Sequence, residues 1–301
     1  MPSPNGDIDK TRELLRKVRR VQVRTDRLAN DVVVGEYRSV FKGRGMEFEE
    51  VREYMRGDDV RTIDWNVTAR MGSAHVKRYV EEREMTAVLL VDVSLSGRFG
   101  STRQLKIDLA TEISAVLAFS AIKNNDKIGL LIFTDHVEMY IPAKKGKRHV
   151  LRVIRELLNF QPVRGGTNVA GALEFLNKVL KRKAVVFLVS DFIDTEFERD
   201  LALTNSRHDL IPVRVSDPRE TSLPDVGLIE LEDAETGERI VIDTHRRKVR
   251  DAYSRSGRTG QETLTGTVRS MGMDLLDVST DRDYMKDLFG FFRRRERRLR
   301  H

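Results

Sequence analysis

Residues 87–92 read AVLLVD, an apolar run that ends in a carboxylate, and the fold can be worked out from this run. An uninterrupted apolar run is typical of a strand covered on both faces, as in a parallel sheet. A second run of this kind, at 184–190, ends immediately before Asp191. Amphipathic helical patterns alternate with these and with shorter apolar runs, and this alternation predicts an α/β fold with a doubly wound, mostly parallel sheet.

The same periodicities locate the other elements of the sheet domain. We expect helices at 102–123, 147–159 and 168–181, helices within 246–270, and a last helix that begins near residue 281. We expect strands at 127–134, 210–215 and 273–278, a strand at 137–141 that pairs as a hairpin, and a second hairpin over 227–243.

The chain is predicted to have three parts. Residues 1–84 precede the sheet domain, which covers 85–280, and 281–301 form a C-terminal helix and an arginine-rich tail. Within the first part, apolar residues at helical spacing over 8–29 predict a basic amphipathic helix. Residues 35–84 are dense in glycine and charge, which indicates short strands and loops around a polar network docked on the sheet domain.

The chain carries a net charge of +7, and the excess lies at its two ends. Residues 85–292 hold 30 basic and 30 acidic residues, whereas 293–301 hold six arginines and one glutamate. Basic ends can bind nucleic acid or anionic surfaces through salt-sensitive contacts, and this stays open as an alternative function. A solvated tail is the simpler interpretation, because no aromatic residues interleave with these arginines to stack on bases.

Several classes of protein are excluded by composition. Cysteine is absent, which excludes disulfide scaffolds, thiolate metal sites and cysteine nucleophiles. No apolar run reaches the length of about 18 residues that a membrane-spanning helix needs. The N-terminus lacks the apolar segment of a secretory signal. We therefore expect a soluble cytoplasmic protein.

Three segments with oxygen-bearing side chains are predicted to meet at the carboxyl ends of the strands, where open α/β sheets bind ligands. Asp92, Ser94 and Ser96 follow the first apolar run, and Asp191 follows the second. Thr167 lies in a GGTN loop before a predicted helix. Carboxylate and hydroxyl oxygens suit Mg²⁺ or Mn²⁺, and two carboxylates balance one divalent cation. The alternative is that these residues only cap the helices that follow the strands.

This order of DxSxS, GGT and a final Asp resembles the metal-ion-dependent adhesion site of von Willebrand A-like domains. The resemblance implies a Rossmann-type sheet and an ion held by the hydroxyls of Ser94, Ser96 and Thr167, with Thr167 bound directly or through water. It implies that Asp92 and Asp191 act largely through metal-bound water. A carboxylate from a partner protein would then complete the coordination.

The resemblance covers residues from about 85 to 280 and departs from the family pattern at Phe192, where many relatives have glycine. We expect this side chain to shape the rim of the site. A second resemblance rests on residues 43–84, which contain GRGMEF, REY, GDDVR, IDW and AR in close order. This segment is similar to an uncharacterised bacterial family with a von Willebrand A-like domain that is associated with MoxR-type AAA+ ATPases. Such an ATPase is therefore implied as a partner.

The same segment alternates arginines with carboxylates around Trp65, the only tryptophan of the chain. The guanidinium of arginine pairs with a carboxylate through two hydrogen bonds. We therefore expect Arg52, Arg56, Arg61 and Arg70 to pair with nearby acidic residues. A structural role for this network is the first interpretation, and a recognition surface is the alternative.

Catalytic motifs are absent from the sequence, which has no P-loop, no GxSxG and no HExxH. Ser94 stands where a phosphatase would need a second acid after Asp92, and a hydroxyl cannot serve as that acid at neutral pH. We therefore predict a non-enzymatic, metal-dependent protein-interaction module, a partner or adaptor of a MoxR-type AAA+ ATPase acting on a client protein. A Mg²⁺-dependent hydrolase is a less favoured alternative.

Overall fold

The computed structural model describes most of the chain in separate stretches. The described residues are 37, 40, 46–81, 85–102, 104–160, 166–194, 196–233 and 237–300. The basic helix expected over 8–29 lies outside them. The chain divides into two compact units, one of residues 41–85 and one of residues 1–40 together with 86–301.

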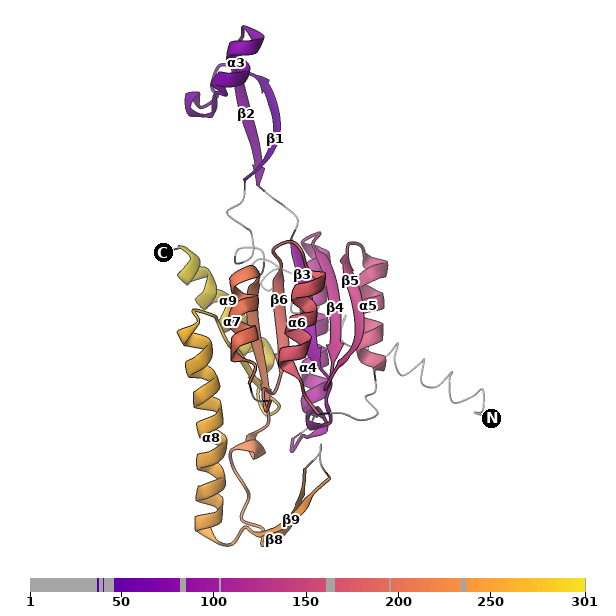
Figure 1. Cartoon of the computed structure of the whole chain (residues 1–301). Coiled ribbons are helices and arrows are strands. Elements are labelled where there is room, and N and C mark those ends of the chain that lie inside the picture. The colour runs from indigo at the N-terminus through magenta and orange to yellow at the C-terminus, as the bar shows by residue number, and fades with distance from the viewer. Residues whose placement is uncertain are drawn as a thin grey trace, which may run out of the picture. The chain divides into compact units, whose positions relative to one another are not determined.

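A six-stranded sheet forms the centre of the larger unit (Figure 1). In spatial order its strands are β10 (Leu276–Ser279), β7 (Asp209–Ser216), β6 (Val185–Ser190), β3 (Thr86–Asp92), β4 (Lys127–Phe133) and β5 (Val137–Lys144). All neighbours pair in parallel except β5, which is antiparallel to β4. Every residue of β6 and all but the first of β3 are buried. The prediction of a doubly wound, mostly parallel sheet is confirmed.

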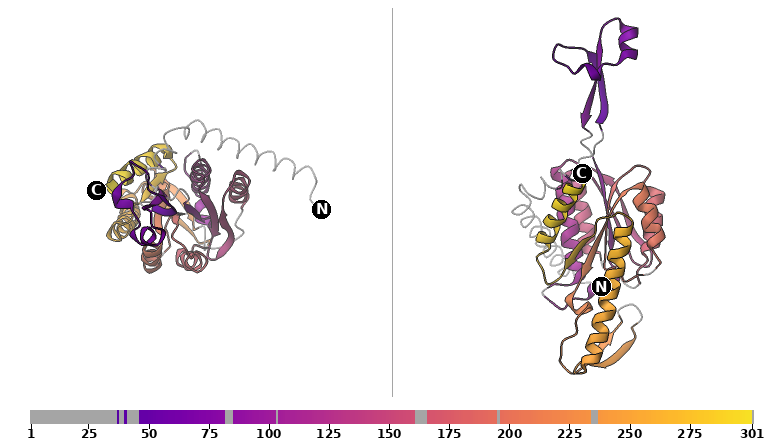
Figure 2. Two further views of the ribbon diagram at one scale, coloured as in Figure 1. Left: turned by 90° about the horizontal axis from the view of Figure 1, so that it is seen from above. Right: turned by 90° about the vertical axis from the view of Figure 1, so that its left-hand side faces the viewer.

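Helices cover both faces of this sheet (Figure 2). One face carries α6 (Val169–Val179), α7 (Glu198–Arg207) and the C-terminal part of α8 (Arg247–Ser270). The opposite face carries α4 (Lys106–Lys123), α5 (Lys147–Asn159) and α9 (Tyr284–Arg300). Helix α7 was not expected, because only Leu201 and Thr204 are buried in it and its apolar spacing is sparse. Helix α8 is continuous where separate helices were expected.

Helix α4 begins at Lys106 rather than at residue 102, because a long-range contact holds the preceding loop. The carboxylate of Asp217, 1% exposed, accepts hydrogen bonds from the backbone nitrogen of Ser101 at 2.9 Å and from its hydroxyl at 2.5 Å. Thr280 Oγ1 donates to the same carboxylate at 2.6 Å. Since Asp217 follows β7 and Thr280 follows β10, the loop after β3 is fixed by the ends of two other strands.

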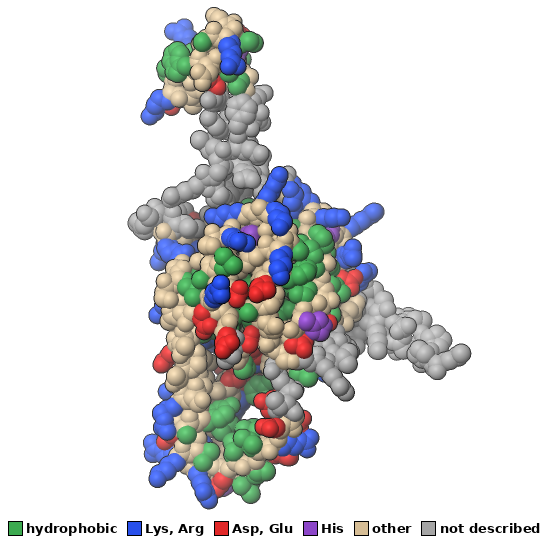
Figure 3. Space-filling model, viewed as in Figure 1, with side chains coloured by type: hydrophobic (Ala, Val, Ile, Leu, Met, Phe, Trp, Pro, Cys, Tyr) green, Lys and Arg blue, Asp and Glu red, His purple; other side chains and the backbone are tan. Residues whose placement is uncertain are grey.

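A two-stranded hairpin follows the carboxyl end of β7, as expected over 227–243. It consists of β8 (Leu228–Glu232) and β9 (Arg239–Asp243), and the short helix η4 (Pro218–Glu220) leads into it. Leu228, Ile240 and Val241 are 73, 56 and 67% exposed. Figure 3 shows hydrophobic side chains gathered over this hairpin, at the lower end of the view.

The smaller unit is built on an antiparallel pair of strands. These are β1 (Met46–Glu53) and β2 (His75–Glu81), and the connection between them contains η2 (Val60–Thr62) and α3 (Trp65–Met71). Short strands were expected here, whereas the helix α3 was not. The two ends of this connection are joined by a hydrogen bond from the backbone nitrogen of Tyr54, just after β1, to the carbonyl oxygen of Ala74, just before β2, at 2.8 Å.

Charged side chains hold this connection in place. Arg52 binds the two oxygens of Asp58 at 2.9 and 2.7 Å, and Arg61 pairs with Asp59 at 3.2 Å. The expected pairing of arginine with carboxylate is therefore confirmed for these two arginines. Trp65 is 68% exposed, so the polar network does not enclose the tryptophan.

Gly257 on α8 offers a test of how closely this helix packs against η4. A Cβ at Gly257 would overlap the backbone oxygen of Glu220, and the backbone cannot move aside as a flexible side chain can. We expect Gly257→Ala to lower the free energy of unfolding by about 1–3 kcal/mol, measured by urea denaturation.

The matched control is Gly260→Ala, where a Cβ meets no atom within 4 Å. It should raise the free energy of unfolding by about 0.5–1 kcal/mol, because alanine favours the helix. Equal effects of the two variants would show that the close contact does not form.

Candidate metal centre

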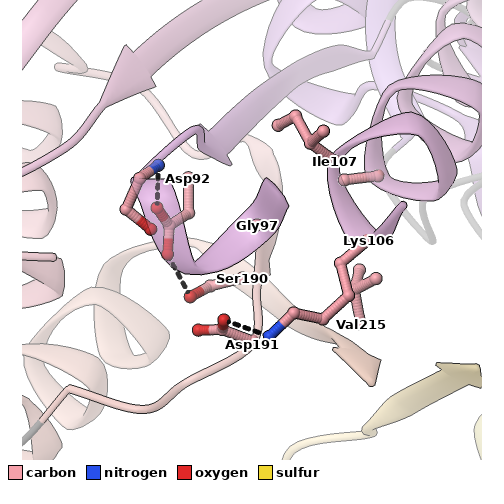
Figure 4. A pocket seen from close by; sticks show the side chains of 9 residues that line it. Asp92, Gly97, Lys106, Ile107, Ser190, Asp191 and Val215 are labelled. Carbon is pink, nitrogen blue, oxygen red and sulfur yellow. Dashed lines mark hydrogen bonds and ion pairs between the residues drawn. The ribbon is translucent and has the colours of Figure 1, made fainter. Parts of the chain in front are cut away.

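The middle of the sheet contains the point where the order of strands reverses. From β3 the chain passes to β4 on one side, and it later returns to β6 on the other side. Open α/β sheets bind ligands beyond the carboxyl ends of the strands at such a point. Asp92 ends β3, Ser190 ends β6 and Asp191 follows it, so three polar side chains meet there (Figure 4).

Asp92 is buried, with 7% of its surface exposed. Its Oδ1 accepts a hydrogen bond from the backbone nitrogen of Ser94 at 2.9 Å, and its Oδ2 accepts one from Ser190 Oγ at 2.6 Å. Burial and the neighbouring charge of Asp191 raise the pKa of Asp92 to about 6, although these hydrogen bonds favour the ionised form. Burial and the charge of Asp191 therefore disfavour the ionised form of Asp92, and a cation bound nearby would stabilise that form.

The hydroxyl groups of Ser94 and Ser96 are hydrogen-bonded to each other, with their Oγ atoms 2.9 Å apart. Adjacent oxygen ligands of an octahedral Mg²⁺, with bonds of about 2.0–2.1 Å, are separated by about 2.9 Å. The two hydroxyls therefore fit one edge of a Mg²⁺ octahedron. Ser94 is the N-cap residue of η3 (Leu95–Arg98), but its side chain makes no capping hydrogen bond. Helix capping thus does not explain the hydroxyl of Ser94.

Asp191 forms a buried ion pair that the sequence analysis missed. Lys106, the first residue of α4, places its Nζ 2.7 Å from Asp191 Oδ2 and 2.5 Å from Glu220 Oε1. The Lys106 side chain is 3% exposed. Burial lowers the pKa of Lys106, but the charges of Asp191 and Glu220 outweigh burial and hold that pKa above its ordinary value. The ammonium is therefore a fixed positive charge beside the site.

One signal in the sequence could have singled out Lys106. A lysine in the first turn of a helix opposes the helix dipole, so a buried position there needs compensating carboxylates. Glu220 carries no such signal, because it reaches Lys106 from η4, 114 residues along the chain. With every group ionised, the carboxylates of Asp92, Asp191 and Glu220 and one ammonium leave a net charge of −2.

The loop expected to supply Thr167 is described only in part. Gly165 lies outside the described residues, whereas Thr167 is half-buried and stands just before α6. Its neighbour Asn168 caps α6 through a side-chain hydrogen bond. The backbone nitrogen of Asn168 also donates to the carbonyl oxygen of Thr134, at 2.9 Å. This contact holds the start of α6 at the carboxyl end of β4.

A small pocket opens between these elements. Its lining residues are Asp92, Ser94, Gly97, Lys106, Ile107, Ala110, Ser190, Asp191 and Val215. The structure therefore brings Asp92, Ser94 and Asp191 to one pocket. Ser96 is hydrogen-bonded to Ser94 beside the pocket, whereas Thr167 does not line it. Across the described part of the chain, no three His, Asp or Glu side chains are grouped so as to hold a metal ion. An ion at this pocket would therefore depend on hydroxyl oxygens.

Phe192 does not shape the rim of the site, and that expectation was wrong. Its backbone adopts a left-handed conformation with φ 58°, which favours glycine and is strained for a bulky residue. The side chain is 8% exposed and packs against Phe197, with ring centroids 5.8 Å apart. The backbone nitrogen of Phe192 donates to Ser190 Oγ at 3.0 Å. Phe192 thus fills the core and orients the hydroxyl that contacts Asp92.

The expected arginine-rich tail continues α9, and part of it is structural. The side chain of Arg295 is 5% exposed and pairs with Asp209 and, at 3.0 Å, with Asp274. Phe291 and Phe292, on the same helix, are 2 and 0% exposed and belong to the hydrophobic core. Within the residues that the structure describes, no helix combines the length and the apolar character needed to cross a bilayer.

Comparisons with known proteins show which family the chain matches. The sequence model of a protein family described as "Protein of unknown function DUF58" matches residues 50–263. The uncharacterised protein Rv1480 of Mycobacterium tuberculosis is 32% identical over 297 residues, which cover 97% of this chain and 92% of that protein.

Two solved structures are also similar to this chain. The conserved hypothetical protein BatB from Bacteroides thetaiotaomicron matches with a TM-score of 0.46 and 12% identity, over 71% of this chain and 99% of that chain. The VWA domain of SpRpn10 matches with a TM-score of 0.37 and 13% identity, over 68% of this chain and 93% of that chain.

Proposed function

The chain belongs to the DUF58 family of proteins of unknown function, and we propose that it is a metal-dependent protein-interaction module without catalytic activity of its own. The observation that carries this proposal is the cluster of oxygens at the carboxyl ends of β3 and β6. There the Ser94 and Ser96 hydroxyls lie 2.9 Å apart beside the buried carboxylate of Asp92.

Each residue of the cluster has a part in holding the ion. Ser94 and Ser96 would offer their hydroxyl oxygens. Thr167 does not line the pocket, and it would have to supply a third oxygen from the loop before α6, directly or through water. Asp92 and Asp191 would supply negative charge beside the ion and could accept hydrogen bonds from its water ligands. When bound, Mg²⁺ or Mn²⁺ supplies an open position for an anionic oxygen from a partner.

The contacts of the polar side chains at the pocket support ion binding rather than catalysis. Both carboxylate oxygens of Asp92 accept hydrogen bonds from the protein, and Asp191 is paired with Lys106. The pocket has no histidine among its described lining residues. None of these groups is thus placed as a general base beside the ion.

An exposed apolar hairpin supports a protein as the partner. The hairpin of β8 and β9 follows the carboxyl end of β7, the edge of the sheet at which Asp92 and Asp191 also lie. Exposed aliphatic groups such as Leu228 and Val241 are typical of protein interfaces when they gather together. The resemblance of residues 43–84 to the MoxR-associated family supports a MoxR-type AAA+ ATPase, or a client protein with a suitable carboxylate, as that partner.

Affinity capture tests this function. The immobilised chain should retain its partners from cell lysate in Mg²⁺ and lose them in EDTA, because the ion would bridge to the partner. The double variant Ser94→Ala, Ser96→Ala should lose the same partners in Mg²⁺. Ser256→Ala, an exposed serine of α8, is the matched control and should retain them. Recovery of the same proteins with EDTA and with Mg²⁺ would contradict the proposal.

A further inference from the structure

Lys106 occupies an unusual position for a lysine beside a cation site. It lines the same pocket as Asp92 and Ser94, and its ammonium is almost fully buried between two carboxylates. Those carboxylates come from separate elements, Asp191 from the end of β6 and Glu220 from η4. In Figure 4 the Lys106 side chain points from α4 toward Asp191.

The surrounding contacts leave this ammonium little freedom to move. Glu220 is held by a capping box, in which its Oε2 accepts a hydrogen bond from the backbone nitrogen of Asp217 at 3.1 Å. The Oδ1 of Asp191 accepts one from the backbone nitrogen of Ile193 at 3.3 Å. The Nζ of Lys106 also lies 5.9 Å from the ring centroid of Phe99. The two charges next to the candidate metal centre are therefore preorganised.

We propose that Lys106 and Glu220 set the affinity of the candidate metal centre for its divalent cation, with opposite signs. This inference rests on the proposed function. The ammonium of Lys106 repels a cation in the shared pocket, and the carboxylate of Glu220 attracts the cation and offsets that repulsion. Charges a few ångströms apart interact strongly where water is excluded, so each group shifts the affinity without being a ligand.

Calorimetric titration with MgCl₂ alone separates this role from a structural one. Lys106→Met raises the net negative charge and should tighten Mg²⁺ binding about tenfold or more. Glu220→Gln leaves Lys106 less compensated and should weaken binding about tenfold. Lys178→Met, which removes a lysine that is 75% exposed on α6, is the control and should leave the affinity unchanged. A merely structural role predicts weaker binding for both pocket variants.

The outcomes distinguish this inference from the proposed function. If wild type binds Mg²⁺ and both pocket variants bind it less tightly or equally, the charge-setting role is overturned and the metal site stands. If only Lys106→Met binds, the charge-setting role stands and the metal dependence of the native chain is overturned. If neither the native chain nor either variant binds, both are overturned. Thermal unfolding in EDTA checks that each variant folds. If Lys106→Met does not fold, Lys106→Gln replaces it, since it also removes the positive charge and should tighten Mg²⁺ binding, whereas a merely structural role predicts weaker binding.

Discussion

Asp92→Asn is expected to weaken Mg²⁺ binding about a hundredfold or more, because it removes a buried negative charge at the candidate metal centre. The amide oxygen of asparagine can still accept one of the two hydrogen bonds that Asp92 accepts from Ser94 and Ser190. The variant also relieves the burial of a carboxylate. We therefore expect the free energy of unfolding in EDTA to change by less than about 1 kcal/mol.

Calorimetry for binding and urea denaturation for stability measure the two effects of Asp92→Asn separately. Asp251→Asn is the matched control, because Asp251 is 53% exposed on α8 and carries the same charge. It should leave both quantities unchanged. An unaltered Mg²⁺ affinity in Asp92→Asn would place any bound ion elsewhere on the chain and remove the basis of the proposed function.

Arg295→Met is expected to lower the free energy of unfolding by about 3 kcal/mol, near the lower end of the cost of breaking a buried ion pair. Methionine fills similar space but leaves Asp209 and Asp274 without the buried cation that joins α9 to the start of β7 and the segment before β10. The lower end applies because these aspartates are 31 and 21% exposed and Arg298 still pairs with Asp274.

Arg297→Met is the control for Arg295→Met, since Arg297 is exposed on the same helix two residues further along. It removes the same charge and should change stability by less than about 0.5 kcal/mol. Urea denaturation followed by circular dichroism makes the comparison. Equal effects of the two variants would mean that the C-terminal arginines act only through their total charge, as a solvated tail would.

The centre of the fold could be predicted from the sequence because it depends on local pattern. The runs at 87–92 and 184–190 are apolar up to their last residues, Asp92 and Ser190, and each corresponds to a buried strand that ends at or beside a carboxylate. Helices α4, α5 and α6 followed from apolar spacing, to within a few residues. Helix α7 escaped prediction because two buried residues make too weak a periodic signal.

The two serines and two aspartates that meet at the pocket were expected from the sequence. Thr167 was expected there and does not line the pocket, and the charges of Lys106 and Glu220 were missed. Asp92, Ser94 and Ser96 are close in sequence, so their proximity follows from the end of one strand. Lys106 reaches Asp191 across 85 residues and Glu220 across 114. Contacts between residues so far apart in sequence cannot be predicted from local pattern. The left-handed backbone conformation of Phe192 could not be predicted from the sequence either.

Local apolar pattern was enough to predict the strands of the large sheet and the oxygen-bearing residues at their carboxyl ends, because a strand that is buried on both faces is apolar along its length. The electrostatics of the site could be known only from the folded chain. A charge acts on whatever lies within a few ångströms of it, and those neighbours arrive from separate elements once the chain has folded. The ammonium of Lys106 beside Asp191 is such a neighbour.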